Sequence, residues 1–276
     1  MDLAIKCSAL QSGYSTPIIA SRRGRRLELD LNSHIERIIY YQNAYETWDT
    51  LFLESIVQPG WIMFDVGVNI GWHSLMASKK IGSNGKIFAF DISPDEMKKL
   101  KRNIELNQLA CIEPILLAMS DRPGKVSISE TRDSGRTSLA VGGQRGKEIE
   151  ATSLDHFVTQ RNISRLDIIK VNIEGAEVKF LSGGRQTLKQ FQPIIVMEFN
   201  PGALKVFGHD VQAPADLLKD HGYQLFKAHR HGLIPLMHLP TGKEYLNVIA
   251  LPKRLMKRGS SLKWRAIAEL GATAPR

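Results

Sequence analysis

The sequence predicts an α/β protein of the doubly wound type, with a mostly parallel seven-stranded sheet and an antiparallel strand at its edge. Short apolar segments alternate with helical patterns about every 30 residues, which is typical of parallel strands joined by crossover helices. Segments such as 166–174 and 193–200 contain few polar residues, as strands covered by helices on both faces require. A glycine-rich turn at 67–71 follows the first apolar segment, where proteins of this type bind ligands.

Strands are expected where apolar residues are continuous or alternate, and helices where they recur every three or four positions. The expected strands are 24–31, 61–66, 85–91, 111–118, 125–129, 166–174, 193–200, 223–228 and 245–251. The expected helices are 45–57, 72–80, 94–107, 153–161, 175–184 and 213–221. The segment 130–147 is rich in Gly, Ser and Arg, so we expect a loop that contacts the substrate. The last two strands have no helical pattern between them, which favours an antiparallel hairpin at the sheet edge.

The chain of 276 residues divides into an N-terminal extension at 1–60, an α/β domain at 61–252 and a basic tail at 253–276. The extension is expected to pack a short strand and a helix on the domain. The tail holds seven Lys and Arg residues against one acid, so most of the net charge of +9 lies there. A solvated tail explains this charge better than a nucleic-acid groove, and we expect no nucleic-acid partner. Weak contact of the tail with a membrane surface is an alternative.

Cysteine usage and hydropathy bear on the compartment. Cys7 and Cys111 are far apart and fit no metal-binding spacing, so we expect neither a disulfide framework nor a cysteine metal site. The N-terminus lacks a signal-peptide core, and no segment approaches the ~20 apolar residues of a membrane span. We therefore expect a cytoplasmic protein, and the sequence contains no signal for its oligomeric state.

The turn after the first predicted core strand is the first candidate binding element. It reads D-V-G-V-N-I-G from Asp65 to Gly71. Gly67 and Gly71 allow a sharp turn close to a ligand, and Asn69 is a residue type that tolerates a left-handed backbone. Asp65 can accept backbone amides from this turn or face an ammonium group of the ligand.

An acid that ends the second core strand indicates an adenosine cofactor. Asp91 can accept hydrogen bonds from both ribose hydroxyls, with capping of the next helix as the alternative role. The neighbouring Ile92, and Ser120 with Asp121 after the third strand, are further candidates for cofactor contacts. Together with the glycine turn, Asp91 favours an adenosine site at this edge.

The spacing of the turn bears on which adenosine cofactor binds. A dinucleotide needs its pyrophosphate cradled, which favours G-x-G-x-x-G, whereas Asn69 occupies the crowded middle of this turn. S-adenosylmethionine has no phosphate, and its carboxylate, ammonium and sulfonium suit a mixture of amides and acids. We therefore expect S-adenosylmethionine, while an NAD(P)-dependent oxidoreductase remains the alternative.

The chain resembles the FkbM family of methyltransferases over roughly residues 24–252. The resemblance rests on FDVGVNIG, FAFDISP, LLAMSDRPGKVSI, TSLDHF, LDIIKVNIEGAE, PIIVMEFN, GYQLF and YLNVIAL, which occur in the family's order. It implies a class I methyltransferase fold and methyl transfer from S-adenosylmethionine, commonly to oxygen. The implied acceptors are a sugar, a glycolipid or another small-molecule secondary metabolite.

Two positions depart from the family pattern. Val68 replaces the usual Ala of the glycine turn, and Asn172 replaces the usual Asp of K-I-D-V-E-G. Asn cannot take a proton as a carboxylate does, so a relative that binds the cofactor without catalysis is a second alternative.

The catalytic candidates are polar residues near the carboxyl ends of the strands. Glu174 is expected to act as a base or to position the acceptor, with capping of the next helix as its other role. Glu198 and Asn172 end neighbouring strands, and His73 begins the helix after the glycine turn. Glu174, Glu198 and Asn172 also allow a divalent metal, although we predict none.

Overall fold

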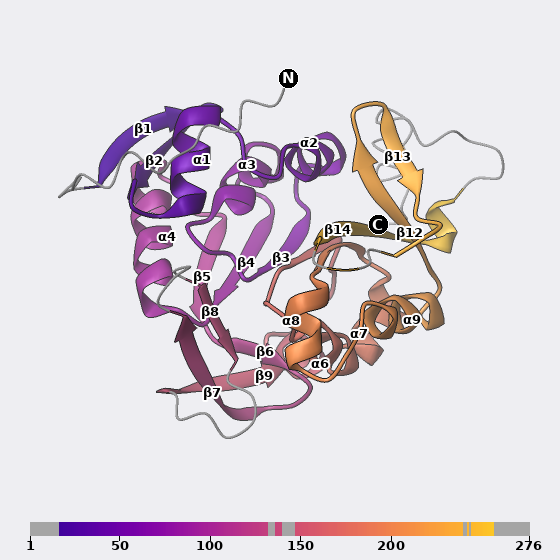
Figure 1. The fold of residues 1–276 in the computed structure, drawn as a ribbon. Helices are drawn as coiled ribbons and strands as arrows, with labels where there is room; N and C mark the ends of the chain where they lie inside the picture. The colour runs from indigo at the N-terminus through magenta and orange to yellow at the C-terminus, as the bar shows by residue number, and fades with distance from the viewer. Residues whose placement is uncertain (1–16, 132–135, 140–146, 240–241, 243, 257–276) are drawn as a thin grey trace.

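The computed structural model describes residues 17–131, 136–139, 147–239, 242 and 244–256. Cys7 and the tail residues 257–276 lie outside these ranges, so the expectations about them are not tested. The described chain contains an eight-stranded sheet, a four-stranded sheet and a two-stranded hairpin (Figure 1). The large sheet has the order β13-β12-β14-β11-β10-β3-β4-β5.

The parallel part of the large sheet contains the strands predicted from the apolar segments. These strands are β3 (Ile62–Val66), β4 (Lys86–Asp91), β5 (Ile112–Leu116), β10 (Ile168–Val171) and β11 (Ile194–Phe199). Their inward and outward side chains build two apolar clusters, one on each face of the sheet. This two-sided burial explains why the strand sequences are nearly continuous apolar runs, and it confirms the doubly wound α/β class.

Helices cover both faces of the sheet, as the alternating pattern predicts. They are α3 (Trp72–Ile81), α4 (Pro94–Leu106), α5 (Leu154–Gln160), α6 (Glu177–Ser182), α7 (Arg185–Phe191), α8 (Pro201–Val206) and α9 (Gln212–Asp220). The predicted helix 175–184 is shorter than expected because Glu174 and Gly175 both have a left-handed backbone. Asn200 caps α8 by accepting the backbone N–H groups of Gly202 and Ala203.

The antiparallel strands lie at one end of the large sheet. β12 (Tyr223–His229) forms a hairpin with β13 (Gly232–Pro235), which is the edge strand. β14 (Leu246–Pro252) lies between β12 and β11 and is antiparallel to both. The sheet therefore has one strand more than the seven predicted, because the segment after His229 turns back and pairs with β12.

A second, smaller sheet occupies the region after β5. β6 (Ala118–Ser120), β7 (Gly124–Thr131), β8 (Arg136–Leu139) and β9 (Lys147–Ser153) pair in the order β6-β9-β7-β8. The expected loop at 130–147 is therefore strand over much of its described part. The predicted strand 111–118 is divided: β5 ends at Leu116, Leu117 still donates its N–H to Asp91 O, and Ala118 begins β6 of the second sheet.

The N-terminal segment packs against the α/β unit. β1 (Ile18–Arg22) and β2 (Arg25–Leu29) form an antiparallel hairpin, followed by α1 (His34–Gln42) and α2 (Thr47–Ile56). Leu27, Leu29 and Phe52 are fully buried in the same apolar cluster as α3 and α4. Figure 1 shows the hairpin beside α4 and α2 beside α3. No helix of the described ranges is both long and apolar enough to span a membrane.

Candidate active site

A cavity opens at the carboxyl ends of β3, β4 and β10. At this point the strand order changes direction, because β4 lies on one side of β3 and β10 lies on the other. It encloses about 1030 Å³ of empty space, including its open mouth. Its lining comes from the glycine turn, the β4–α4 junction, the β6 and β8 strands, the end of β10, α1 and the segment before α2. This is the place where open α/β sheets bind ligands.

Two glycines shape the turn between β3 and α3. Gly67 has φ of +79°, and a Cβ atom there would lie 1.7 Å from the carbonyl oxygen of Asn172. Gly71 has φ of +94°, and a Cβ there would lie 2.5 Å from Leu100 Cδ1. Asn69 between them is left-handed, with φ of 53°, as its residue type allows. The turn is thus pressed against both β10 and α4.

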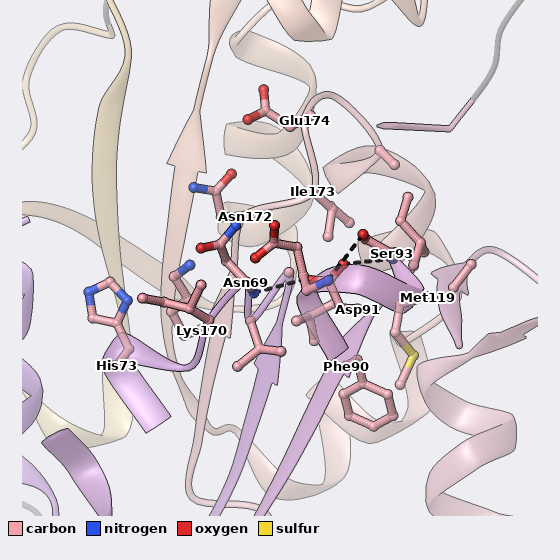
Figure 2. A pocket seen from close by; sticks show the side chains of 18 of the residues that line it. Asn69, His73, Phe90, Asp91, Ser93, Met119, Lys170, Asn172, Ile173 and Glu174 are labelled. Atoms are coloured by element: carbon pink, nitrogen blue, oxygen red, sulfur yellow. Dashed lines mark hydrogen bonds between the residues drawn. The ribbon is translucent and has the colours of Figure 1, made fainter. Parts of the chain in front are cut away.

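Asp91 joins the glycine turn to the start of α4. Its Oδ2 accepts the backbone N–H of Asn69 at 2.8 Å, and its Oδ1 accepts that of Ser93 at 2.9 Å. Burial raises the pKa of this carboxyl, while the backbone hydrogen bonds oppose the rise. A carboxylate has about four lone-pair sites, so each oxygen retains one for a ligand hydroxyl. Asp91 therefore organises the turn and still faces the cavity (Figure 2).

One end of the cavity is apolar. Phe90, Ile92, Met119 and Leu139 line it, and they come from both the large and the small sheet. Figure 2 shows Phe90 and Met119 on one side of Asp91, while His73 and Lys170 lie on the other side. The cavity is thus divided into an apolar end, a middle at Asp91 and a polar end.

Asn172 and Glu198 form a pair at the ends of β10 and β11. Asn172 Nδ2 donates to Glu198 Oε2 at 3.3 Å, and the buried Oδ1 of Asn172 has no hydrogen-bond partner. Burial raises the pKa of Glu198 to about 7, and the charge of Glu174 adds to the rise. Asn172 lines the cavity, whereas Glu198 lies behind it. An amide donor beside Glu198 avoids the repulsion that a second carboxylate would bring.

Lys170 and Asp65 occupy neighbouring positions on β10 and β3. Ser74 Oγ donates to Asp65 Oδ2 at 2.6 Å, while the buried Oδ1 has no hydrogen-bond partner. Burial raises the pKa of Asp65, and the positive charge of Lys170 opposes the rise. Lys170 is only 6% exposed, yet it lines the cavity.

His73 and Glu46 meet beside the polar end of the cavity. His73 Nε2 lies 3.4 Å from Glu46 Oε2, a separation longer than a well-formed hydrogen bond, and both side chains are buried. Burial lowers the pKa of His73 to about 4, which keeps the imidazole neutral at pH 7. Glu46 has a left-handed backbone with φ of 42°, an unusual conformation for this residue type.

The structure brings together seven of the predicted site residues. Gly67, Asn69, His73, Asp91, Ile92, Asn172 and Glu174 line the cavity. The cavity lining does not include Asp65, Gly71, Ser120, Asp121 and Glu198. Asp65 binds Ser74 and Gly71 packs against Leu100, so these two residues stabilise the turn without lining the cavity. Ser120 Oγ donates a hydrogen bond to the exposed Asp121 at 3.0 Å. Figure 2 shows the Glu174 carboxylate at a distance from Asp91, beyond Asn172.

Sequence reasoning missed three residues of this region. Lys170 carries a signal that was available, because a lysine inside an apolar strand needs an explanation. Tyr45 lines the cavity and packs near His73, with ring centroids 6.2 Å apart. Tyr45 and Glu46 precede α2, and nothing in their local pattern predicts contact with the glycine turn. Within the described ranges, no three His, Cys, Asp or Glu side chains gather as metal ligands would.

The fold and this cavity define the class of protein. A parallel sheet with β14 inserted antiparallel beside β11, a glycine turn without the G-x-G-x-x-G spacing and an acid that ends β4 are features of a class I methyltransferase dependent on S-adenosylmethionine. The chain belongs to the FkbM methyltransferase family: the family model described as "Methyltransferase FkbM domain" matches residues 65–225. The predicted family is thereby confirmed.

Individual relatives differ in what they are named for. The chain is 26% identical over 196 residues to the hexuronic acid methyltransferase AglP of Haloferax volcanii, which covers 70% of this chain and 77% of that protein. It is 31% identical over 101 residues to the tRNA (guanine(37)-N(1))-methyltransferase Trm5b of Pyrococcus abyssi, covering 37% of this chain and 28% of that protein. A solved FkbM methyltransferase from Methylobacillus flagellatus is 14% identical, with a TM-score of 0.44, and covers 78% of this chain and 52% of that one.

Proposed function

We propose that this methyltransferase transfers the methyl group of S-adenosylmethionine to a hydroxyl oxygen of a sugar, free or within a glycan or glycolipid. The observation that carries the proposal is the polar rim formed by Asn172 and Glu174 beside a cavity suited to an adenosine donor. The proposed donor site depends on Asp91, and the proposed acceptor site depends on the residues at the end of β10.

The donor fits the cavity by its chemistry. The adenine ring suits the apolar end between Phe90, Ile92 and Met119, and the ribose hydroxyls suit the free lone pairs of Asp91. The glycine turn lacks the G-x-G-x-x-G spacing that cradles a pyrophosphate. This argues for a donor without phosphate and against the nicotinamide alternative.

The acceptor is placed by the geometry of the transfer. Methyl transfer is an in-line displacement at carbon, so the protein must align the acceptor oxygen and receive its proton. Bound S-adenosylmethionine supplies an activated methyl group on a sulfonium centre. Glu174, at the rim of the cavity, is our candidate for the group that positions the hydroxyl and takes its proton. Glu198 accepts from Asn172 Nδ2 and so holds this amide in place next to the acceptor position.

A sugar acceptor is supported by the relative that covers most of this chain. That relative is named for hexuronic acid, which is a sugar with both hydroxyl and carboxyl groups. The carboxylates Glu174, Asp91 and Glu96 line the cavity, and they disfavour an acceptor that reacts through its own carboxylate. A hydroxyl acceptor agrees better with this charge.

The proposal is tested with S-adenosylmethionine labelled in its methyl group. Neutral sugars, uronic acids and sugar glycosides are offered as acceptors, and each labelled product is treated with mild alkali. Methyl ethers survive alkali, whereas methyl esters release methanol, so we expect an alkali-stable label on a sugar. Label found only in an alkali-labile ester or on an amine would refute methylation of a hydroxyl. Calorimetric binding of NADH in preference to S-adenosylhomocysteine would support the oxidoreductase alternative instead.

A further inference from the structure

Lys170 is a buried cation for which the described residues provide no direct partner. Its side chain is 6% exposed, and its Nζ forms neither an ion pair within 4.0 Å nor a hydrogen bond in the described part of the chain. Lysine is almost never buried without a paired group, because desolvation of its ammonium is costly. The charge of Lys170 acts on the nearby acids Asp65, Asp91 and Glu198 without a direct ion pair, and its side chain lines the cavity, so a ligand anion can contact it there.

Unpaired polar atoms surround this lysine. Asn172 Oδ1, Asp65 Oδ1 and Glu46 Oε1 are buried acceptors that have no hydrogen-bond partner, and His73 Nε2 is also unpaired. Buried polar atoms are nearly always hydrogen-bonded, and of these four residues Asn172 and His73 line the cavity, so an occupant there can pair with them. A cation next to several unpaired acceptors is complementary to a zwitterion rather than to a simple anion.

The position of the cluster identifies the zwitterion. Lys170 and His73 lie on the side of Asp91 opposite to Met119 (Figure 2). An adenosine donor with its base at Met119 and its ribose at Asp91 extends its thioether chain toward this polar end. The end of that chain carries an α-carboxylate and an α-ammonium.

From this placement, which rests on the proposed donor site, we infer that Lys170 binds the α-carboxylate of S-adenosylmethionine and that Asn172 Oδ1 accepts from its α-ammonium. Lys170 is then a specificity-determining residue that distinguishes the complete donor from truncated adenosine thioethers. The inference gives Asn172 a role that does not require a carboxylate, since an amide oxygen can also accept from an ammonium.

The test compares two probes by isothermal titration calorimetry. S-Adenosylhomocysteine has the amino-acid end, whereas 5′-methylthioadenosine has the same nucleoside and sulfur without it. Lys170→Met removes the charge, and Lys227→Met removes the charge of an exposed lysine on the same sheet as a matched control. We expect Lys170→Met to weaken the binding of S-adenosylhomocysteine about 10- to 150-fold, the range for a charged hydrogen bond. Its affinity for 5′-methylthioadenosine should stay within about twofold.

The outcomes separate this inference from the proposed function. Equal losses for both probes, or no loss for either, would overturn the role of Lys170 while the donor site stands. Failure of the wild-type protein to bind either probe would remove the proposed function together with this inference. Lys170→Gln, which keeps a polar end group without charge, replaces Lys170→Met if the apolar variant does not fold, and the same selective loss is expected.

Discussion

Asp91→Asn is the substitution that most directly tests the donor site. The Asp91 carboxylate accepts two backbone N–H groups, from Asn69 at 2.8 Å and from Ser93 at 2.9 Å. An asparagine has one acceptor oxygen, so its NH2 group would face one of these N–H donors and that hydrogen bond would be lost. The remaining ribose contact also changes from a charged to a neutral acceptor.

The expected loss follows from those contacts. A hydrogen bond to a charged group contributes about 1.5–3 kcal/mol, which corresponds to an affinity loss of about 10- to 150-fold. We expect calorimetry with S-adenosylhomocysteine to show a loss of this size for Asp91→Asn. Asp95→Asn, at an exposed acid in the first turn of α4, should leave the affinity unchanged.

A second ligand separates the ribose contact from the organisation of the turn. The wild-type protein should discriminate S-adenosylhomocysteine from its 3′-deoxy analogue, and Asp91→Asn should discriminate less. A folded Asp91→Asn protein that binds S-adenosylhomocysteine within twofold of wild type would refute the assignment of Asp91 to the ribose.

Three further predictions concern stability, and chemical denaturation measures each of them. Gly67→Ala should lower the free energy of unfolding by about 2–4 kcal/mol, because its Cβ meets the Asn172 carbonyl oxygen. Gly208→Ala, at a similar φ with open space around it, should cost only about 1 kcal/mol, and equal losses would contradict the proposed clash. Burial raises the pKa of Glu198 to about 7. Between about pH 4.5 and 7 the unfolded state releases the Glu198 proton and the folded state keeps it, so the free energy of unfolding of the wild type falls as the pH rises. Glu198→Gln should therefore gain up to about 3 kcal/mol over wild type at pH 8 but little at pH 4.5, and a pH-independent difference would count against it. Asn172→Asp replaces the amide that lies 3.3 Å from Glu198 by a carboxylate, so its unfolding free energy should fall below that of wild type increasingly from pH 6 to 9. An unchanged profile would mean that the two groups do not interact.

The parallel core was predictable from sequence because burial on two faces leaves a strong signal. β3, β4 and β11 each consist of a short apolar run bounded by polar or glycine residues, and the structure places them within about two residues of the prediction. The class of fold and the binding edge of the sheet follow from these strands. The glycine turn and Asp91 were predictable for the same reason, since they directly follow strand ends.

The second sheet was only partly predictable: a strand was predicted at 125–129, within β7, whereas β8 and the first residue of β9 lie in the segment 130–147, which is rich in Gly, Ser and Arg. The antiparallel pairing of β7 with β9 joins residues up to 27 positions apart, such as Gly124 and Ala151, which local composition does not report. Local composition therefore gave the wrong expectation for 130–147.

The polar end of the cavity was hidden for a different reason. Glu46 reaches His73 from the segment before α2, and Asn247 of β14 donates to Asp49 across 198 positions in sequence. Hydrophobic periodicity describes which face of an element is buried, and it contains no information about such cross-chain polar pairs. Lys170 was visible in the sequence, but its importance depends on the absence of a direct partner among the described residues.

The contribution of α1 and the segment before α2 to the cavity has a thermodynamic consequence. Ile35 and Tyr45 line the same space as Asp91 and Asn172, so a bound donor touches chain segments on both sides of Ile62. Ligand that binds only the docked arrangement stabilises it by RT ln(1 + [L]/Kd). Cofactor binding therefore stabilises the packing of the first 40 described residues on the sheet, and this packing in turn favours cofactor binding. Saturating cofactor should slow proteolysis within this leading segment.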